Sequence, residues 1–269
     1  MPEGDSIYKE ARKLDAALKG RRVVRGELRV AALVGADLVG STVLQHDTHG
    51  KHLLTRFDNG QTLHTHLRMD GSWSVVRPGR TLPRALDPDI RVLLAATEGP
   101  TAYGLLIPVV ELIATAAEHE VVGYLGPDPL RVDWDAETAI ARLAREPDRA
   151  INAALLDQRN LAGLGNLWVN ELCFLRGLNP WTPVREVDLP ALVGLAARTL
   201  RHSALVPGAY QVTTGNNRRG QDHWVAGRAH QPCRRCGTQI RVTAEVTGDP
   251  ERRRTWWCPR CQPGPEPPD

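Results

Sequence analysis

Pro2 and Glu3, at the start of the chain, are residues whose types and order allow covalent chemistry at a carbon atom. A small second residue such as proline normally allows the initiator methionine to be removed, so we expect Pro2 to present a free secondary amine. An α-amino group titrates near about 7.7–8.0, against about 10.4 for lysine, and is partly unprotonated at neutral pH. Such an amine can attack a sugar C1′ or an aldehyde and form a permanently charged iminium. Many chains begin with Met-Pro, so Pro2 and Glu3 alone do not establish this chemistry. They become significant only together with the motifs described below.

Four cysteines near the C-terminus have the spacing of metal ligands. Cys233 and Cys236 form one Cys-x2-Cys pair, and Cys258 and Cys261 form a second pair after 21 intervening residues. Two such pairs can deliver four thiolates to one tetrahedral Zn²⁺. The alternative is two disulfides, which a cytosolic chain does not normally keep. A closed four-cysteine site has no open position for chemistry, so the sequence predicts one structural zinc ion.

The residues between the two cysteine pairs predict a zinc β-ribbon with a cationic tip. Strands are expected over Ile240–Val246 and Thr255–Trp257, and the hairpin tip between them carries Arg252, Arg253 and Arg254. Three arginines on a rigid finger suit contact with phosphate, although a solvated run of charges is the alternative. The fifth cysteine, Cys173, lies among apolar residues and is expected in a core.

A glycine-rich turn, Gly-Leu-Gly-Asn, ends at Asn166 between two predicted helices. Its glycines, Gly163 and Gly165, allow tight turns and a close approach of the backbone to a ligand. We expect Asn166 to be the N-cap of the following helix, whose first N–H groups and dipole favour an anion. The motif is compatible with a clamp on backbone phosphate, but glycine turns between helices are common.

The first half of the chain is predicted to form an antiparallel β domain, a sandwich with one helix packed on it. The helix is expected over Asp5–Lys19, and Asn59-Gly60 is a strong hairpin turn. A second helix is expected within Pro108–Glu120. The predicted strands are Arg22–Leu28, Thr42–Asp47, Leu53–Asp58, Gln61–His66, Gly71–Val76, Ile90–Thr97 and Tyr103–Ile107.

Helical periodicity replaces strands after the proline- and glycine-rich linker at Gly126–Pro129. The expected helices are Asp135–Glu146, Asp148–Gln158, Asn166–Arg176 and Leu189–Leu205. Strands first and helices second predict segregated domains and an α+β multidomain fold. We expect a β-sandwich domain over 1–126, a helical domain over 127–228, a zinc finger over 229–263 and a disordered tail over 264–269.

Composition limits the class of protein. The chain has 269 residues, of which 42% are hydrophobic, and its net charge of +3 suggests an anionic partner. No apolar run reaches the roughly 20 residues of a membrane span, and no signal peptide is predicted, so we expect a cytosolic protein without a membrane partner. Only four of the 34 basic residues are lysines, and three of these lie on the first predicted helix, which leaves Lys51 alone in the rest of the chain.

Four motifs occur here in one order: Met-Pro-Glu-Gly at the start, His-Gly-Lys-His around Lys51, the glycine turn ending at Asn166, and the four-cysteine ribbon. Together they resemble the formamidopyrimidine-DNA glycosylase and endonuclease VIII family of base-excision repair enzymes, over residues 2–262. The resemblance implies a β-sandwich domain joined to a helix–two-turns–helix domain and a zinc finger. It also implies a bifunctional glycosylase and abasic-site lyase that acts on damaged DNA.

Roles follow from the resemblance residue by residue. Pro2 resembles the Schiff-base nucleophile, and Glu3 resembles the acid/base partner that protonates the opening deoxyribose. Lys51 matches a lysine that contacts phosphate and assists elimination, although a lone lysine is more often solvated. Asn166 matches a phosphate-binding asparagine, and Arg253 matches the finger arginine linked to δ-elimination.

The remaining candidates for DNA contact are also implied by the resemblance. Arg252 or Arg254 takes the role of the finger arginine if the hairpin register differs. Arg159 is a further candidate. A nucleotide must be turned out of the stack for its C1′ to be reached, and Arg68 and Met69 are the expected wedge residues that fill the hole. The alternative for Met69 is an ordinary core position.

Departures from the family pattern favour the endonuclease VIII branch, whose usual substrates are oxidised pyrimidines. The Asp-Pro-Arg-Arg-Phe-Gly loop of the formamidopyrimidine branch is missing near Tyr103–Glu111. An arginine that precedes Gly-Pro-Asp in some members is replaced here by Tyr124-Leu125, so that phosphate contact is in doubt.

We expect the lesion-recognition loop within Pro207–Ala226. Five histidines, at 46, 49, 52, 64 and 66, are not expected to bind a second metal, because no acidic ligand is evident nearby.

Two other hypotheses remain open at the level of sequence. One is a non-catalytic damage-binding module that keeps the fold, and the other is a zinc-ribbon interaction protein without nucleic acid. The intact set Pro2, Glu3, Lys51 and Arg253 favours the enzyme. We expect a monomer that binds damaged double-stranded or single-stranded DNA and lies in the bacterial cytoplasm, associated with the nucleoid.

Overall fold

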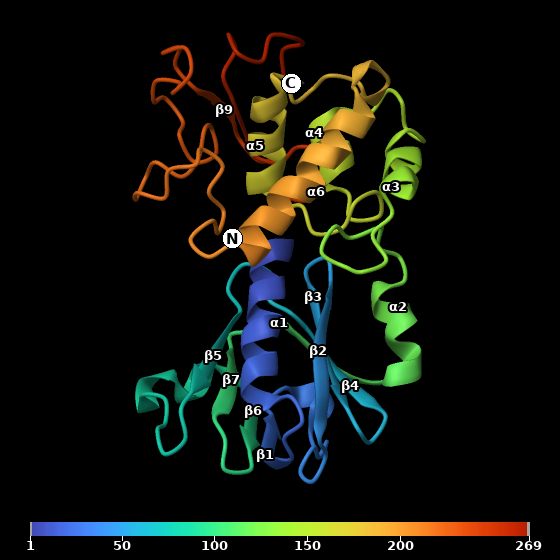
Figure 1. Ribbon diagram of the computed structural model, residues 1–269, viewed down its shortest axis with the longest axis vertical. Coiled ribbons are helices and arrows are strands. Elements are labelled where there is room, and N and C mark those ends of the chain that lie inside the picture. Colours follow the sequence, from blue (N-terminus) through green and yellow to red (C-terminus); the bar gives the residue numbers. More distant parts are fainter. Residues whose placement is uncertain (1, 268–269) are drawn as a thin grey trace. The chain divides into compact units, whose positions relative to one another are not determined.

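A computed structural model describes residues 2–267 of the chain, which divide into two compact units (Figure 1). The N-terminal unit contains Ser6–Tyr124 together with Pro2, and the C-terminal unit contains Glu3–Asp5 together with residues 125–267. Glu3–Asp5 therefore belong to the C-terminal unit although they lie at the start of the sequence. Met1, and residues 268 and 269 of the tail expected to be disordered, lie outside the described part of the chain.

Two antiparallel sheets and one long helix, α1 (Gly4–Leu18), account for most of the N-terminal unit. The strand orders are β1-β6-β7-β5 and β2-β3-β4-β8. Phe57 and Leu63 from one sheet, Val92 from the other, and Ile7 and Leu14 from α1 share one buried core, as expected for a sandwich covered by a helix. The strands are β1 (Val23–Leu28), β2 (Val43–His49), β3 (His52–Phe57), β4 (Gln61–His66), β5 (Ser72–Val76), β6 (Ile90–Ala96), β7 (Thr101–Leu105) and β8 (Val109–Ala114).

The expected helix within Pro108–Glu120 is wrong for most of its length. Val109–Ala114 forms β8, which pairs with β4, and only Glu118–Val122 forms an α-helix, α2. The run Val-Val-Glu-Leu-Ile is rich in β-branched residues, and pairing with β4 satisfies backbone groups that a helix would have satisfied internally. Because β7 ends at Leu105, the turn into β8 is short, and Ile107 of the predicted strand instead packs in the core.

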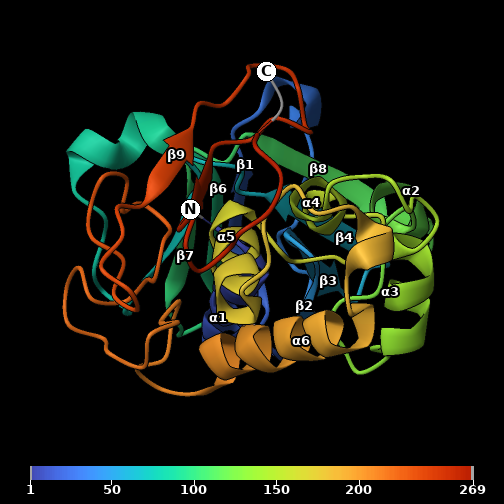
Figure 2. The ribbon, with the colours of Figure 1, turned by 90° about the horizontal axis from the view of Figure 1, so that it is seen from above.

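Four helices build the core of the C-terminal unit: α3 (Ala136–Leu143), α4 (Ile151–Leu156), α5 (Asn166–Arg176) and α6 (Leu189–Leu205). Leu143, Leu155, Trp168, Leu172 and Leu200 are fully or almost fully buried in this core. α5 and α6 pack against each other (Figure 2). α4 is shorter than predicted, because residues on both sides of it form turns rather than further helix.

A two-stranded ribbon follows the helices. β9 (Arg241–Thr243) pairs with β10 (Thr255–Trp257), so the first strand is shorter than the sequence predicted. Phe174 of α5 packs with Val225, Ile240 and the cysteines in a small separate core. Cys173 is fully buried in the helical core, as predicted. Among the described residues, no helix is both long and apolar enough to cross a membrane.

Candidate functional site

The Glu3 carboxylate lies at the N-terminus of α5. It is fully buried, and it accepts hydrogen bonds from the backbone N–H groups of Gly165 (2.8 Å), Leu167 (2.9 Å) and Trp168 (3.4 Å). These N–H groups have no partner within the helix, and the helix dipole favours a negative charge at this end. The anion held by this turn is therefore a side chain of the protein itself.

The prediction that Asn166 is the N-cap of α5 is wrong, since Gly165 occupies that position. A side chain at Gly165 is excluded by Glu3, because an added Cβ would lie 2.4 Å from the Glu3 Cδ atom. Asn166 is the first residue of the helix, and its side-chain Nδ2 donates to the Arg254 carbonyl oxygen (2.8 Å). The amide thus holds the base of the ribbon hairpin in this structure.

The Met-Pro-Glu-Gly segment contacts the glycine turn, although the two lie about 160 residues apart in the sequence. The Gly4 N–H donates to the Gly163 carbonyl oxygen (2.8 Å), and a Cβ on Gly4 would lie 2.8 Å from the Gly163 Cα. Gly163 has a φ of +98°, which disfavours other residues there. Pro2 is half-buried and is joined directly to Glu3, so the fixed carboxylate holds the chain next to the candidate nucleophile.

Asp5 and Ser203 are two further buried polar residues of this region, and the sequence analysis singled out neither of them. Asp5 is fully buried and accepts from the Trp168 indole N–H (3.2 Å), the Ser203 hydroxyl (2.5 Å) and the Gln211 side chain (3.4 Å). The Gln211 backbone N–H donates to the same Ser203 hydroxyl (2.8 Å). A fully buried carboxylate at position 5 gives no signal in sequence periodicity, because its partners lie about 160 and 200 residues away.

Lys51 occupies the turn between β2 and β3 in the N-terminal unit, next to a cluster of histidines. Burial lowers the pKa of His52 to about 3, and burial followed by the charge of Lys51 lowers the pKa of His66 to about 4. Both imidazoles are therefore neutral at pH 7. Lys51 is half-buried, and its charge is one of the causes that disfavour protonation of both rings.

The histidines form a hydrogen-bonded chain with an acidic end. His52 Nδ1 lies 2.8 Å from His64 Nε2, and His64 Nδ1 lies 2.8 Å from Glu111 Oε2. His52 Nε2 lies 3.1 Å from the Tyr124 hydroxyl. The expectation that no acidic group is near the histidines was wrong, because Glu111 lies on β8, which the sequence had suggested was a helix. His64 and Glu111 are direct partners across β4 and β8.

The three arginines of the ribbon tip differ in their surroundings. Arg253 Nε lies 2.9 Å from Glu245 Oε1, so this guanidinium is paired within the ribbon. Arg254 is exposed and has no ion pair among residues 2–267. Arg252 is half-buried and lines, with Arg253 and Glu251, a cavity of about 310 Å³ beside Asn152 and Trp181.

Met69 is exposed rather than part of the core. Its exposed fraction is 60%, and the preceding Arg68 has a φ of +46°, a conformation that non-glycine residues adopt rarely. Gly71 closes this loop, since a Cβ there would lie 2.8 Å from the Leu67 carbonyl oxygen. The loop after β4 therefore projects an arginine and an apolar side chain outward.

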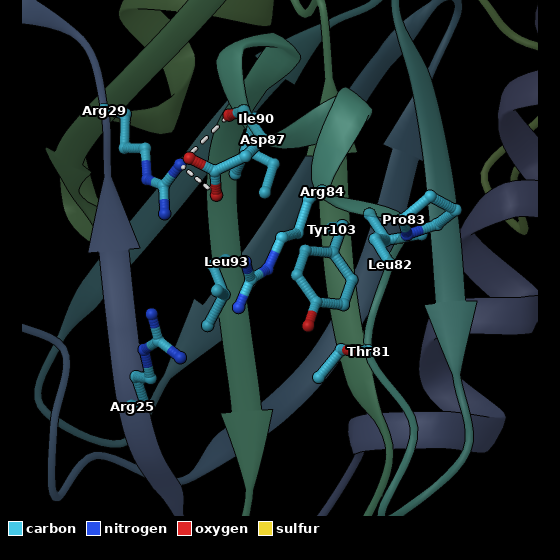
Figure 3. Close-up of a pocket in the computed structure, with 10 residues that line it drawn as sticks. All are labelled: Arg25, Arg29, Thr81, Leu82, Pro83, Arg84, Asp87, Ile90, Leu93 and Tyr103. Carbon is cyan, nitrogen blue, oxygen red and sulfur yellow. Dashed lines mark hydrogen bonds and ion pairs between the residues drawn. The ribbon is translucent and has the colours of Figure 1, made fainter.

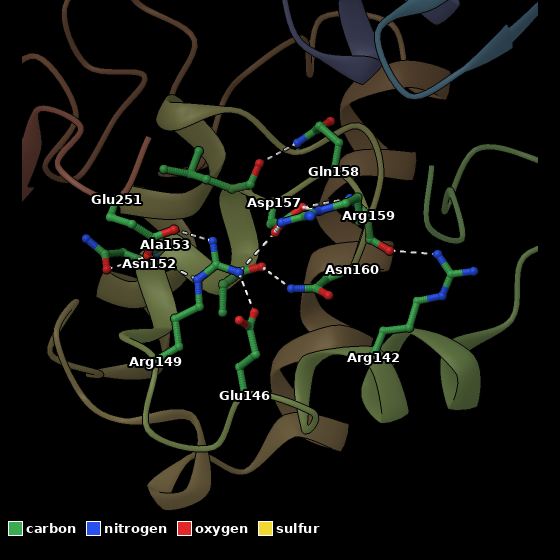
Figure 4. Close-up of polar contacts among 12 residues, drawn as sticks. Arg142, Glu146, Arg149, Asn152, Ala153, Asp157, Gln158, Arg159, Asn160 and Glu251 are labelled. Carbon is green, nitrogen blue, oxygen red and sulfur yellow. Dashed lines mark hydrogen bonds and ion pairs between the residues drawn. The ribbon is translucent and has the colours of Figure 1, made fainter. Parts of the chain in front are cut away.

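Arg159 is part of an ion-pair network around Asp157 (Figure 4). Its guanidinium donates to both Asp157 carboxylate oxygens (2.9 and 2.6 Å), and Arg149 donates to the same carboxylate (3.0 Å). Arg149 also pairs with Glu146 and with Glu251 of the ribbon hairpin. Most of the Arg159 side chain remains exposed, so it is positioned by Asp157 while still facing solvent.

The four predicted zinc ligands converge. Their sulfur atoms all lie within 4.8 Å of one another, with Cys233 to Cys261 at 3.9 Å and Cys236 to Cys258 at 3.5 Å. A tetrahedral site with Zn–S bonds of about 2.3 Å requires sulfur–sulfur separations of about 3.8 Å. Hydrogen bonds from Thr238 lower the pKa of Cys236 to about 6, which favours one thiolate. The donor set and its spacing fit a single tetrahedral metal ion.

A larger pocket, of about 550 Å³, lies on the N-terminal unit (Figure 3). Arg25, Arg29, Arg84 and Tyr103 are among the residues that line it. Arg29 pairs with Asp87, as the dashed lines in Figure 3 show. The pocket contains none of the residues that the sequence singled out.

Comparisons with known proteins agree with this geometry. The formamidopyrimidine-DNA glycosylase N-terminal domain matches residues 1–102, and the formamidopyrimidine-DNA glycosylase H2TH domain matches residues 125–204. The architecture and the glycine turn are thus those of a helix–two-turns–helix DNA glycosylase. The chain belongs to the formamidopyrimidine-DNA glycosylase family, and its similarity to the relatives described next supports the endonuclease VIII branch.

"Probable endonuclease 8 2" of Streptomyces coelicolor is 49% identical over 99% of this chain and 96% of that protein. "DNA-(apurinic or apyrimidinic site) lyase Nei2" of Mycolicibacterium smegmatis is 39% identical over 97% of this chain and 99% of that protein. The solved structure of Lactococcus lactis Fpg (MutM) in complex with DNA containing N7-benzyl-Fapy-dG has a TM-score of 0.77 at 22% identity. It covers 98% of this chain and 100% of that chain, and it confirms the predicted fold.

We expect Gly165→Ala to destabilise the protein by about 1–3 kcal/mol, because the new methyl group must displace the Glu3 carboxylate or the backbone. Gly194→Ala on α6 is a matched control, since its Cβ would meet only the flexible end of Arg198 at 3.3 Å. This control should be neutral or stabilising by up to about 1 kcal/mol. Urea unfolding followed by circular dichroism measures both, and equal stabilities would contradict the steric argument.

Asp157→Asn should lower the Tm at pH 7, and the difference from wild type should shrink as the pH falls. Hydrogen bonds from Arg159 and Arg149 lower the pKa of Asp157. A carboxylate whose folded-state pKa is depressed stabilises the protein above its unfolded pKa of about 3.9 and loses this contribution at lower pH. Thermal unfolding at pH 7, 5 and 3.5 tests this, and a gap that stays constant with pH would count against it.

Proposed function

We propose that this protein is a bifunctional DNA glycosylase and abasic-site lyase that uses Pro2 as its nucleophile. The observation that carries the proposal is the Glu3 carboxylate, fixed by three N–H groups at the start of α5 and joined to Pro2. Family membership supports the same assignment, as does a relative at 39% identity named as an abasic-site lyase.

The proposed reaction begins when the Pro2 lone pair attacks C1′ of a flipped nucleotide. The glycosidic bond breaks, and the damaged base leaves with the electron pair of that bond and a proton. The proton that the Pro2 nitrogen loses passes through the Glu3 carboxylate to O4′ as the C1′–O4′ bond opens, and C1′ becomes an iminium. The iminium acidifies C2′, whose proton is removed, and the C3′–O bond breaks to release the 3′ side of the strand. A second elimination removes a C4′ proton and breaks the C5′–O bond, which releases the 5′ side of the strand. Water then hydrolyses the iminium and frees the sugar fragment from Pro2.

Other residues of this chain are assigned roles around that reaction. Lys51 contacts a phosphate and assists elimination, and burial keeps His52 and His66 beside it neutral. Asn166 and the ribbon arginines Arg252, Arg253 and Arg254 approach the phosphate backbone, with Arg253 assisting the second elimination. Because Arg253 is paired with Glu245, DNA must compete for that guanidinium.

We assign oxidised pyrimidines as the substrate class. Only residues 106–108 connect β7 and β8, so there is no room for the void-filling loop of the formamidopyrimidine branch. Arg68 and Met69 then fill the space left by the flipped nucleotide, with Arg159 as a further contact to DNA. The exposure of Met69 and the left-handed backbone of Arg68 support this role.

The remaining assignments concern the metal ion, the oligomeric state, the form of the DNA and the cellular location. Zn²⁺ is the metal that four thiolates in this arrangement would hold, and its chemistry there is structural, fixing the ribbon. The protein acts as a monomer on double-stranded or single-stranded damaged DNA. Its place of action is the cytoplasm, where chromosomal DNA is accessible.

Borohydride should trap a covalent adduct between the processed protein and a duplex that contains thymine glycol or an abasic site, because hydride reduces the iminium. Peptide mass spectrometry should place the adduct on Pro2. Pro2→Gly should strongly reduce the adduct formed from the intact damaged base, while Lys51→Met should retain it. An adduct located on Lys51, or no adduct with any lesion, would overturn the assignment of Pro2.

Glu3→Gln should reduce base excision by about 10²–10⁴-fold, the range that a positioned acid/base group contributes. The amide keeps the size of the side chain, so a thermal unfolding curve should show whether the fold persists. Single-turnover cleavage of the damaged duplex measures the rate. Wild-type rates in a folded Glu3→Gln protein would show that the carboxylate takes no part in the chemistry.

A further inference from the structure

The pocket of about 550 Å³ on the N-terminal unit is built on the sheet β1-β6-β7-β5. Successive residues of a strand point to opposite faces of its sheet. Val92 and Leu94 of β6 are buried in the sandwich core, whereas Leu93 between them packs with Tyr103 of β7 in a small separate cluster. Leu93 and Tyr103 are direct partners across the two strands, and both line the pocket. The pocket therefore lies on the face of the sheet opposite the sandwich core.

Two segments form the walls of this pocket. Residues 81–84 line one wall and lead through a 3₁₀-helix, η2 (Arg84–Asp89), into β6. Leu82 of this wall packs against the apolar cluster on the sheet, so apolar contact holds the wall in place. The opposite wall is β1, which carries Arg25 and Arg29. The result is a concave site with an apolar floor and arginines on both sides (Figure 3).

Tyr103 places a polar atom in the apolar floor. Only 7% of this residue is exposed, and its hydroxyl has no hydrogen-bond partner among residues 2–267. Figure 3 shows this hydroxyl pointing towards Thr81, whose own hydroxyl is likewise without a partner in the described part of the chain. Nearly all buried polar side chains have a partner, so a nine-tenths buried tyrosine that offers its hydroxyl to a cavity points to a ligand with a polar edge.

The charges around the pocket do not balance within the protein. Arg25 and Arg29 donate to the same carboxylate, that of Glu27 (2.6 and 2.8 Å), and Arg29 also donates to Asp87 (3.1 Å). Arg84 has neither an acidic partner nor a side-chain hydrogen bond among the residues that the structure describes. Its guanidinium extends across the sheet, and Figure 3 shows it between Leu93 and Tyr103. The surplus positive charge of the pocket is therefore Arg84.

We propose that this pocket binds a nucleoside monophosphate, with the phosphate on Arg84 and the base over Leu93 and Tyr103. The planar fork of a guanidinium matches the oxygens of a phosphate. A base has apolar faces and polar edges, which suit an apolar floor that contains a hydroxyl. A volume of about 550 Å³ lies within the range of small-molecule sites, whereas a phosphate ion alone would leave most of it empty.

This site shares no residue with the proposed glycosylase and lyase chemistry. Lys51 lies in the turn between β2 and β3 of the other sheet, and Arg68 and Met69 lie in the loop after β4. Pro2 is not among the residues that line the pocket. The inference therefore does not rest on the proposed function, and either one can fail without the other.

Calorimetric titration of the full chain with thymidine and adenosine 5′-monophosphates tests the proposal. The protein is first saturated with a duplex that contains a tetrahydrofuran abasic analogue, and the titration is carried out at low salt because screening weakens contacts between exposed charges. We expect one site, with an affinity about 10-fold or more above that for inorganic phosphate or thymidine, because each of these lacks half of the contacts.

Three variants assign the binding to this pocket. Arg84→Gln should weaken it by about 10-fold or more, the value of a lost charge-assisted hydrogen bond, and Tyr103→Phe by about 3-fold to 10-fold, the value of a neutral one. Arg77→Gln is the matched control and should bind like the wild type. Arg77 is an exposed arginine of the same segment between β5 and β6, it does not line the pocket, and it has no ion pair within residues 2–267. Thermal unfolding shows whether each variant keeps its fold.

Four results would overturn the proposal. The first is the absence of binding by either nucleotide at millimolar concentration, and the second is an equal affinity for inorganic phosphate, which would remove the base from the site. The third is nucleotide binding that the duplex abolishes. The fourth is a loss of affinity for the duplex itself in Arg84→Gln, without nucleotide binding in the wild type, which would make the pocket a contact for DNA. Nucleotide binding in a protein that gives no borohydride adduct would reject the lyase and keep the pocket.

Discussion

The structure of this protein depends on the contact between the Glu3 carboxylate and the first N–H groups of α5. This contact uses a helix terminus without partners inside the helix, which a phosphate could otherwise occupy, to hold Glu3, the residue that is joined to Pro2. It explains why Gly165 has no side chain, since a Cβ there would lie 2.4 Å from the Glu3 Cδ atom. Gly4 is excluded from carrying a side chain by a different neighbour, Gly163. Residues near a chain terminus are ordered only when something fixes them, and this contact fixes Glu3.

The electrostatics of the N-terminal unit follow a different principle. Beside Lys51, burial lowers the pKa of His52 to about 3 and that of His66 to about 4, so both of these rings are neutral at pH 7. The hydrogen bonds between His52 and His64 and between His64 and Glu111 fix the orientation of these two rings.

The C-terminal unit uses buried carboxylates as fixed points for its loops. Asp5 holds Gln211, Glu171 holds both ends of the loop before the ribbon, and Asp157 holds two arginines. Each of them replaces lost hydration with several N–H or O–H donors, without which burial of the carboxylate would be costly. The unit thus achieves ordered loops with little regular secondary structure after α6, and the cysteine cluster adds the last of these fixed points.

The sequence by itself determined the features that are local. Hydrophobic periodicity predicted α5, α6 and most strands, turn residues predicted the hairpin at Asn59-Gly60, and cysteine spacing predicted the cluster of four sulfur atoms. Only the tertiary structure decided what depends on contacts between distant segments. Val109–Ala114 became a strand because β4 needed a partner, and Gly165 rather than Asn166 became the helix cap because Glu3 occupies the space in front of it. Hydrogen bonds that join residues 47 positions apart, as for His64 and Glu111, or 163 positions apart, as for Asp5 and Trp168, leave no local pattern. Asp5 and Glu111 could therefore be found only once the chain was folded.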